Sequence, residues 1–104
     1  MTKTVTMKEI YEACDAAGRK AGDEAYKGIM GGCGFAWVNI RASGKFFKFI
    51  QENSLGKKNS YESGATIWVY QYGQHANAKY AYAMAFADKL NEFGIVATYD
   101  GRLD

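Results

Sequence analysis

Several residues and motifs that carry enzyme chemistry are scarce or missing in this 104-residue chain. It has no proline, one histidine (His75) and two cysteines, Cys14 and Cys33. A zinc site of the usual Cys/His type would need all three of these plus a carboxylate, and no close cysteine or histidine pair is present to start one. No serine lies in a G-x-S-x-G motif, and the glycines before residue 35 follow a helical pattern rather than a strand, so they are not a dinucleotide fingerprint. The sequence therefore predicts no metal and no cofactor.

A small enzyme that uses His75 or Cys33 is the outside alternative. Cys33 stands between two glycines, but no histidine is near it in the sequence to lower the pKa of its thiol. No general acid, base or nucleophile is paired elsewhere in the chain. We therefore lean against an enzyme and assign no catalytic residue.

Long apolar segments are also missing. The longest wholly apolar run is Tyr80 to Ala87, far short of the roughly 20 residues that a membrane-spanning helix needs. The N-terminal residues contain no hydrophobic signal-peptide core, and two cysteines are too few for a disulfide framework. We expect a cytoplasmic protein that has no membrane partner and keeps its thiols reduced.

The composition that is present belongs to a globular protein. Hydrophobic residues make up 48% of the chain and charged residues 23%, which is enough apolar surface for one modest core. We therefore expect one domain over residues 1–104, with an N-terminal helix at about 6–28 and a sheet-and-helix body at about 35–101.

Periodicity supplies the expected elements. Thr6 and Glu9 have the spacing of a capping box, which predicts where the first helix begins. Two glycines in this helix, Gly18 and Gly22, stand four residues apart and allow another backbone to approach closely. The later segments predict a strand at 35–41, a short helix from Ser43, a weakly extended stretch at 57–62, a strand at 65–72, a helix at 75–93 and a strand at 95–100.

This order predicts an α+β fold with a ferredoxin-like split βαβ sheet of three to four strands, plus the additional N-terminal helix. The helices from Ser43 and His75 should cover the same face of the sheet. Alternation then gathers aromatic side chains on the other face. That set is Phe35, Trp37, Asn39, Arg41, Trp68, Tyr70 and Tyr72.

An aromatic sheet face needs a cover, because each such ring buries 150–250 Å² when it is packed. We expect the N-terminal helix to be that cover, since its apolar stripe has no other obvious partner. The two alternatives are a second copy of the chain, giving a homodimer, and single-stranded nucleic acid, whose bases stack on the sheet aromatics of RNA-recognition modules.

Basic residues are concentrated in one stretch. The segment 41–58 contains five basic residues and one acidic residue, Glu52, although the net charge of the whole chain is only +2. Such a patch can hold phosphates, and it is also typical of a solvated surface. Together with the aromatic face it gives the candidate binding residues: Trp37, Arg41, Lys45, Lys48, Lys57, Lys58, Trp68 and Tyr70.

Four strings resemble small uncharacterised proteins encoded by phages and prophages. They are 32–38 (GCGFAWV), 67–69 (IWV), 81–87 (AYAMAFA) and 101–104 (GRLD). The resemblance implies an accessory protein that acts by binding, inside a bacterial host cell, and it assigns no functional residue. The expected function is a non-enzymatic binding protein that contacts a host factor or itself. The alternative is a module that binds single-stranded nucleic acid.

Overall fold

The structure is a computed structural model that describes residues 5–28, 32–41, 44–58 and 64–103. It contains three helices, α1 (Met7–Tyr26), α2 (Gly44–Glu52) and α3 (Ala76–Glu92). Its strands are β1 (Gly34–Ile40), the two-residue β2 (Lys57–Lys58), β3 (Ala65–Trp68) and β4 (Ala97–Leu103). The predicted α+β class is confirmed. Ser43 and most of the stretch predicted as weakly extended, residues 59–62, lie outside the described residues.

The strands form one antiparallel sheet in the order β2-β3-β1-β4. In the centre of the sheet Trp37 lies opposite Trp68, and Val38 lies opposite Ile67. On the other side of β1, Val38 lies opposite Tyr99. This register places both tryptophans on one face and the aliphatic residues on the other.

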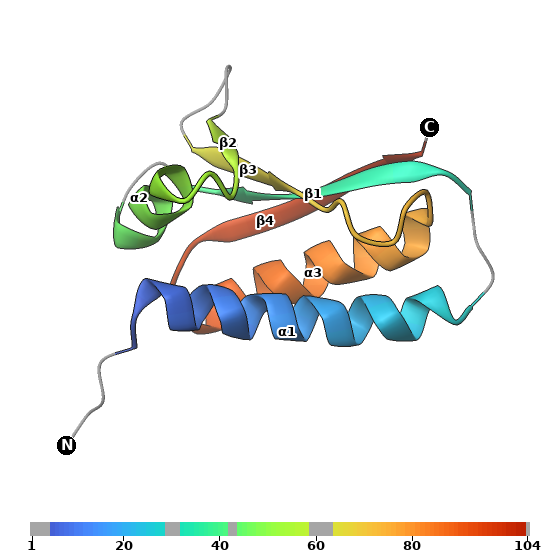
Figure 1. Ribbon diagram of the computed structural model, residues 1–104, viewed down its shortest axis with the longest axis horizontal. Helices are drawn as coiled ribbons and strands as arrows, with labels where there is room; N and C mark the ends of the chain where they lie inside the picture. Colours follow the sequence, from blue (N-terminus) through green and yellow to red (C-terminus); the bar gives the residue numbers. More distant parts are fainter. Residues whose placement is uncertain (1–4, 29–31, 42–43, 59–63, 104) are drawn as a thin grey trace.

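The helices lie on the aliphatic face. Figure 1 shows α3 running beneath β1 and β4, with α1 beside α3 and α2 at one end of the sheet. The side chains between them form one core, in which Val38, Phe86 and Leu90 are fully buried. α2 adds Phe46 and Ile50 to this same core.

α1 begins where the sequence predicts. Thr6 is its N-cap, the Glu9 N–H donates to Thr6 Oγ1 (3.1 Å), and the Glu9 carboxylate accepts from the Thr6 N–H (3.3 Å). The capping box is therefore confirmed, and each side chain satisfies a backbone donor that the first turn leaves free.

The expected position of this helix is wrong. α1 packs along α3, on the helix side of the sheet, and does not cover the aromatic face (Figure 1). Its stripe packs on α3, where the Tyr82 ring occupies the space over Gly18. Ile10 and Cys14 are the α1 residues that enter the core.

The two helix glycines receive aromatic rings rather than a backbone. A Cβ at Gly18 would lie 2.7 Å from Tyr82 Cδ2, and one at Gly22 would lie 2.5 Å from Tyr72 Cε2. Since contacting carbons normally stay 3.5–4.0 Å apart, only glycine leaves room for these rings. The predicted close approach is thus made by two tyrosine side chains.

Two predicted strand boundaries are also wrong. β3 ends at Trp68, and Tyr72 has a positive φ (71°), so its ring leaves the sheet and packs on α1. Tyr72 is therefore not part of the aromatic face. The last strand begins later and runs further than predicted, to Leu103, which brings Arg102 into the sheet beside Phe35.

Candidate binding face

The face of the sheet opposite the helices carries three aromatic side chains. The rings of Trp37 and Trp68 lie with centroids 4.9 Å apart and planes tilted by 48°. Phe35 meets Trp68 edge-on, at 6.4 Å and 90°. Trp68 is 46% exposed and Phe35 37% exposed. We call this set the aromatic face. No other element within the described ranges covers it.

Phe35 is flanked by two cations. The Arg102 guanidinium carbon, from β4, lies 5.8 Å from the ring centroid, and the Lys79 ammonium, from α3, lies 5.7 Å from it. Lys79 is itself buried, with its Nζ 3.5 Å from the Gly34 carbonyl oxygen. Cations at these distances are attracted to an aromatic ring. They hold Phe35 in place while Arg102 stays exposed at the edge of the face.

A polar row follows the aromatic face along the strands. Thr66 Oγ1 donates to Asn39 Oδ1 at 3.0 Å, so the two central strands are joined by side chains as well as by backbone. Lys57 pairs with Thr66 from β2, and Thr98 pairs with Asn39 from β4. The row therefore places polar groups directly beside the tryptophan pair.

The predicted basic residues lie in different places. Lys57 pairs with Thr66, two residues from Trp68 on the same face of β3, which puts this cation next to the aromatic face. A hollow of about 310 Å³ beside Lys57 is lined by Tyr70 together with Tyr11 of α1 and Tyr82 of α3, so Tyr70 lies toward the helices. Arg41 and Lys45 line a different hollow, of about 380 Å³, at the α2 end of the sheet. Arg41 also borders Asn39 and Thr98, at the end of the polar row.

The remaining candidates do not gather at this face. Lys48 lies on the exposed side of α2, 4.0 Å from the Glu52 carboxylate. The backbone of Lys58 pairs with Ala65, and its side chain lies outside the described part of the structure. Tyr70 follows the end of β3 and is 78% exposed. The structure thus brings together Trp37, Trp68 and Lys57, with Arg41 at the margin, whereas Tyr70 lies toward α1.

Arg102 is missing from the predicted binding residues, because the last strand is predicted to end at residue 100. Phe35 is predicted on the correct face of the sheet, but it is not among the predicted binding residues. The signal for Arg102 is present in the alternation of Thr98, Asp100 and Arg102, which continues the strand pattern to the open face.

His75 and Cys33, the two residues of the small-enzyme alternative, lie at the start of α3 and beside it. His75 is the N-cap of α3: its Nδ1 accepts from the Ala78 N–H at 3.1 Å, so the ring proton lies on Nε2, which is buried without a hydrogen-bond partner. The Tyr26 ring lies 5.0 Å away over the imidazole. Cys33 is exposed, and its backbone bridges to His75. Cys14 is buried in the core, and burial raises the pKa of its thiol to about 12.

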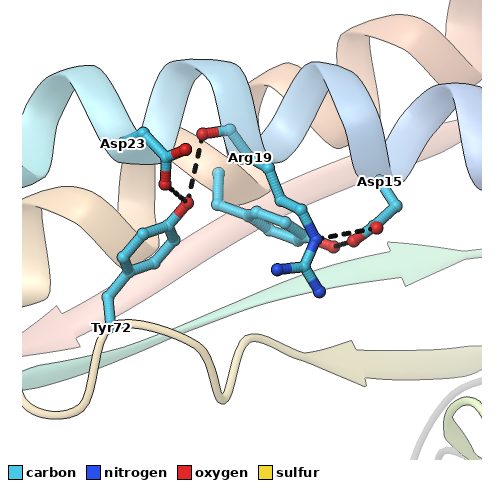
Figure 2. A network of polar contacts seen from close by, with 5 residues as sticks. Asp15, Arg19, Asp23 and Tyr72 are labelled. Atoms are coloured by element: carbon cyan, nitrogen blue, oxygen red, sulfur yellow. Dashed lines mark hydrogen bonds and ion pairs between the residues drawn. The ribbon is translucent and has the colours of Figure 1, made fainter.

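A tyrosine and carboxylate network joins α1 to the rest of the protein, on the side away from the aromatic face. Figure 2 shows Arg19 Nε donating to Asp15 Oδ2 (2.8 Å) and the Tyr72 hydroxyl donating to Asp23 Oδ1 (2.8 Å). Tyr82 also donates to Asp15. Desolvation and the hydrogen bond to Asp23 raise the pKa of Tyr72 to about 12. These contacts fasten the helix and are structural.

Comparison with known proteins adds no assignment: no protein-family model matches the chain, and no curated protein or solved structure matches it significantly. None of the helices in the described ranges is long and apolar enough to span a bilayer. Within the same ranges, no three histidine, cysteine, aspartate or glutamate side chains gather where they could hold a metal ion. The chemistry of the aromatic face is therefore the basis for a functional proposal.

Proposed function

We propose that this protein is a non-enzymatic binding protein and that its aromatic face binds single-stranded nucleic acid. The observation that carries the proposal is the opposed pair Trp37 and Trp68, on the two central strands of a sheet face that no described element covers. Bases that are free of a duplex stack on aromatic side chains, and this stacking tolerates any sequence because every base has a π-face.

Charge beside the rings supports the same ligand. Lys57 on β2 lies on one side of the tryptophan pair and Arg102 on β4 lies on the other, so a strand stacked across the rings would meet a cation at each margin. The exposed Arg41 adds a third cation at the end of the polar row. The hydroxyl and amide groups of Thr66 and Asn39 are polar partners for base edges or sugars.

The ferredoxin-like arrangement is part of this proposal. The strand order β2-β3-β1-β4 supports it, as does the chain order strand, helix, strand, strand, helix, strand after α1. In such a sheet β1 and β3 are central, which is where RNA-recognition modules carry their stacking aromatics. Trp37 and Trp68 occupy these two strands here.

The test is the fluorescence anisotropy of labelled single-stranded DNA and RNA oligonucleotides titrated with the protein at low salt. We expect binding that weakens steeply as salt rises. Trp68→Ala should weaken it roughly tenfold, since stacking contributes about 1–3 kcal/mol per base. Lys57→Ala should lower the salt slope by about 1. Tyr26→Ala, which removes a 53% exposed tyrosine from α1, is the matched control and should leave binding unchanged.

A protein partner is the second candidate function, and the packing of two rings on Trp68 favours it. Phe35 and Trp37 each contact Trp68, so the three rings also form a single apolar patch with polar groups along one side. Buried tryptophans at the centre of such patches dominate binding energy in protein interfaces. A host factor is the partner class that the resemblance to phage-encoded proteins implies.

The nucleic-acid and protein-partner proposals predict different results in these experiments. Unchanged anisotropy with every oligonucleotide at low salt would show that the nucleic-acid proposal is wrong. A bacterial protein retained by the wild-type chain, lost with Trp68→Ala and kept with Tyr26→Ala would then assign the face to a protein partner.

A further inference from the structure

Among the described strands, none pairs with the outer edge of β4. The Val69 N–H donates to the Ala36 carbonyl (3.0 Å), so Ala36, Val38 and Ile40 exchange hydrogen bonds with the β3 side. Because bonded and non-bonded pairs alternate in antiparallel sheets, the residues between them bond to β4 instead. Their partners on β4 are Thr98, Asp100 and Arg102.

The remaining β4 residues therefore direct their N–H and C=O groups away from the sheet. They are Ala97, Tyr99, Gly101 and Leu103, and no described strand pairs with them on that side. The Gly101 N–H agrees with this direction, since it donates to its neighbour Asp100 Oδ1 (2.8 Å) rather than to a strand. An unpaired edge of this kind is a template for another strand.

An apolar groove runs along the same edge. Tyr80 and Met84, from the outer side of α3, line a hollow of about 430 Å³ together with Gly101 and Leu103. The side chains of Tyr80, Met84 and Leu103 are 44%, 39% and 67% exposed. The edge thus offers backbone pairing and apolar contact at one place.

The charges of β4 identify the occupant. Asp100 and Arg102 lie on the same face of the strand, two residues apart. If a second β4 pairs antiparallel about a two-fold axis at Gly101, each Asp100 lies opposite the partner's Arg102, and each Tyr99 lies opposite the partner's Leu103. A shift of the axis to Asp100 places two carboxylates opposite each other, and an axis at Tyr99 forms no ion pair. Opposite charges in cross-strand pairs stabilise a sheet and like charges destabilise it.

We propose that a second copy of this chain pairs with the β4 edge in the register centred on Gly101. The contact is isologous, so one Asp100–Arg102 pair and its symmetry mate form together. The two four-stranded sheets become one continuous sheet, and the two aromatic faces lie on the same side of it. The inference is independent of the ligand proposed above.

The test is sedimentation equilibrium of the full chain from low micromolar to submillimolar concentration. We expect a dimer of wild-type protein, and a dissociation constant about tenfold larger for Asp100→Arg and for Arg102→Asp, since each variant replaces two attractive pairs with two repulsive ones. Mixing the two variants should restore the dimer, because the arginines of one copy then face the aspartates of the other at both cross-strand pairs. This mixture also shows that the variants are folded.

A second variant probes the apolar side of the same contact. Leu103→Lys places a charge in the groove opposite the partner's Tyr99, at a position that is 67% exposed in the single copy, and should weaken the dimer without lowering the melting temperature of the monomer. Wild-type protein that stays monomeric over the whole concentration range would overturn the proposal. A dimer that neither charge variant weakens, or that the mixture does not restore, would overturn it as well.

Discussion

Replacing Gly18 by alanine should destabilise the protein, although alanine is the better helix former. Gly18 lies in the middle of α1, where alanine gains about 1 kcal/mol of helix propensity. The new Cβ would lie 2.7 Å from two carbons of the Tyr82 ring, about 1 Å inside normal contact. That ring cannot move freely, since Tyr82 is 2% exposed, packs on Phe86 and donates to Asp15.

The two effects can be compared in magnitude. Overpacking a well-packed core costs about 1–3 kcal/mol, and a ring displaced from Asp15 loses a hydrogen bond that contributes about 1 kcal/mol. The clash therefore outweighs the gain in propensity, and we expect Gly18→Ala to lower the free energy of unfolding by about 1–3 kcal/mol. In a domain of this size that corresponds to a fall in Tm of about 4–24 °C.

Urea unfolding followed by circular dichroism measures this difference. Ala16→Gly is the matched control: Ala16 is exposed on the same helix, so this variant reports the propensity effect alone, about 1 kcal/mol. If Gly18→Ala is as stable as the wild-type protein or more stable, the ring of Tyr82 does not occupy the space over Gly18, and the packing of α1 on α3 described above is wrong.

Three further outcomes are expected. Thr6→Ala should lower the free energy of unfolding by about 1 kcal/mol in the same urea assay, because it removes the N-cap of α1. Burial and the Asp23 hydrogen bond raise the pKa of Tyr72 from 10.0 to about 12, so the stability that this group contributes is present below pH 10 and is lost as the pH rises toward 12. Tyr72→Phe should flatten this alkaline loss in thermal melts, and an unchanged profile would contradict the packing of Tyr72 against α1. With a thiol reagent at neutral pH, Cys33 should react at once and Cys14 only in denaturant, whereas two fast thiols would place Cys14 outside the core.

Local signals in the sequence predict local structure well. The Thr6–Glu9 spacing marks the start of α1, and alternation from residue 35 places Trp37 and Val38 on opposite faces, both as observed. His75 precedes the alanine-rich segment and is the N-cap of α3. These features depend on residues within one or two turns of each other, so periodicity and capping chemistry are sufficient to find them.

The position of α1 in the fold depends on tertiary packing. Its stripe of small and apolar residues suits an aromatic sheet face and an alanine-rich helix equally well. The structure joins it to α3 because Tyr72 and Tyr82 enter the gaps at Gly22 and Gly18. Neither contact has a sequence signal, since the partners are more than 40 residues apart.

The Tyr72 contact also explains the wrong prediction for the end of β3. Tyr72 alternates correctly for a strand, yet its hydroxyl reaches Asp23 and the Arg19 carbonyl, and the chain turns at a positive φ to bring it there. At the other edge, Asp100 and Gly101 look like a turn in sequence but continue β4 as far as Leu103. The aromatic face therefore loses Tyr72, and the candidate site gains Arg102.

The most direct test of the binding face is a nuclear magnetic resonance titration that observes the two indole N–H signals. The chain has only two tryptophans, so these two signals report the aromatic face alone. Addition of a short single-stranded oligonucleotide at low salt should shift both signals together, because Trp37 and Trp68 are neighbours under the same ligand. Indole signals that do not move while backbone signals elsewhere do would contradict the account, and so would two indoles that respond at different ligand concentrations.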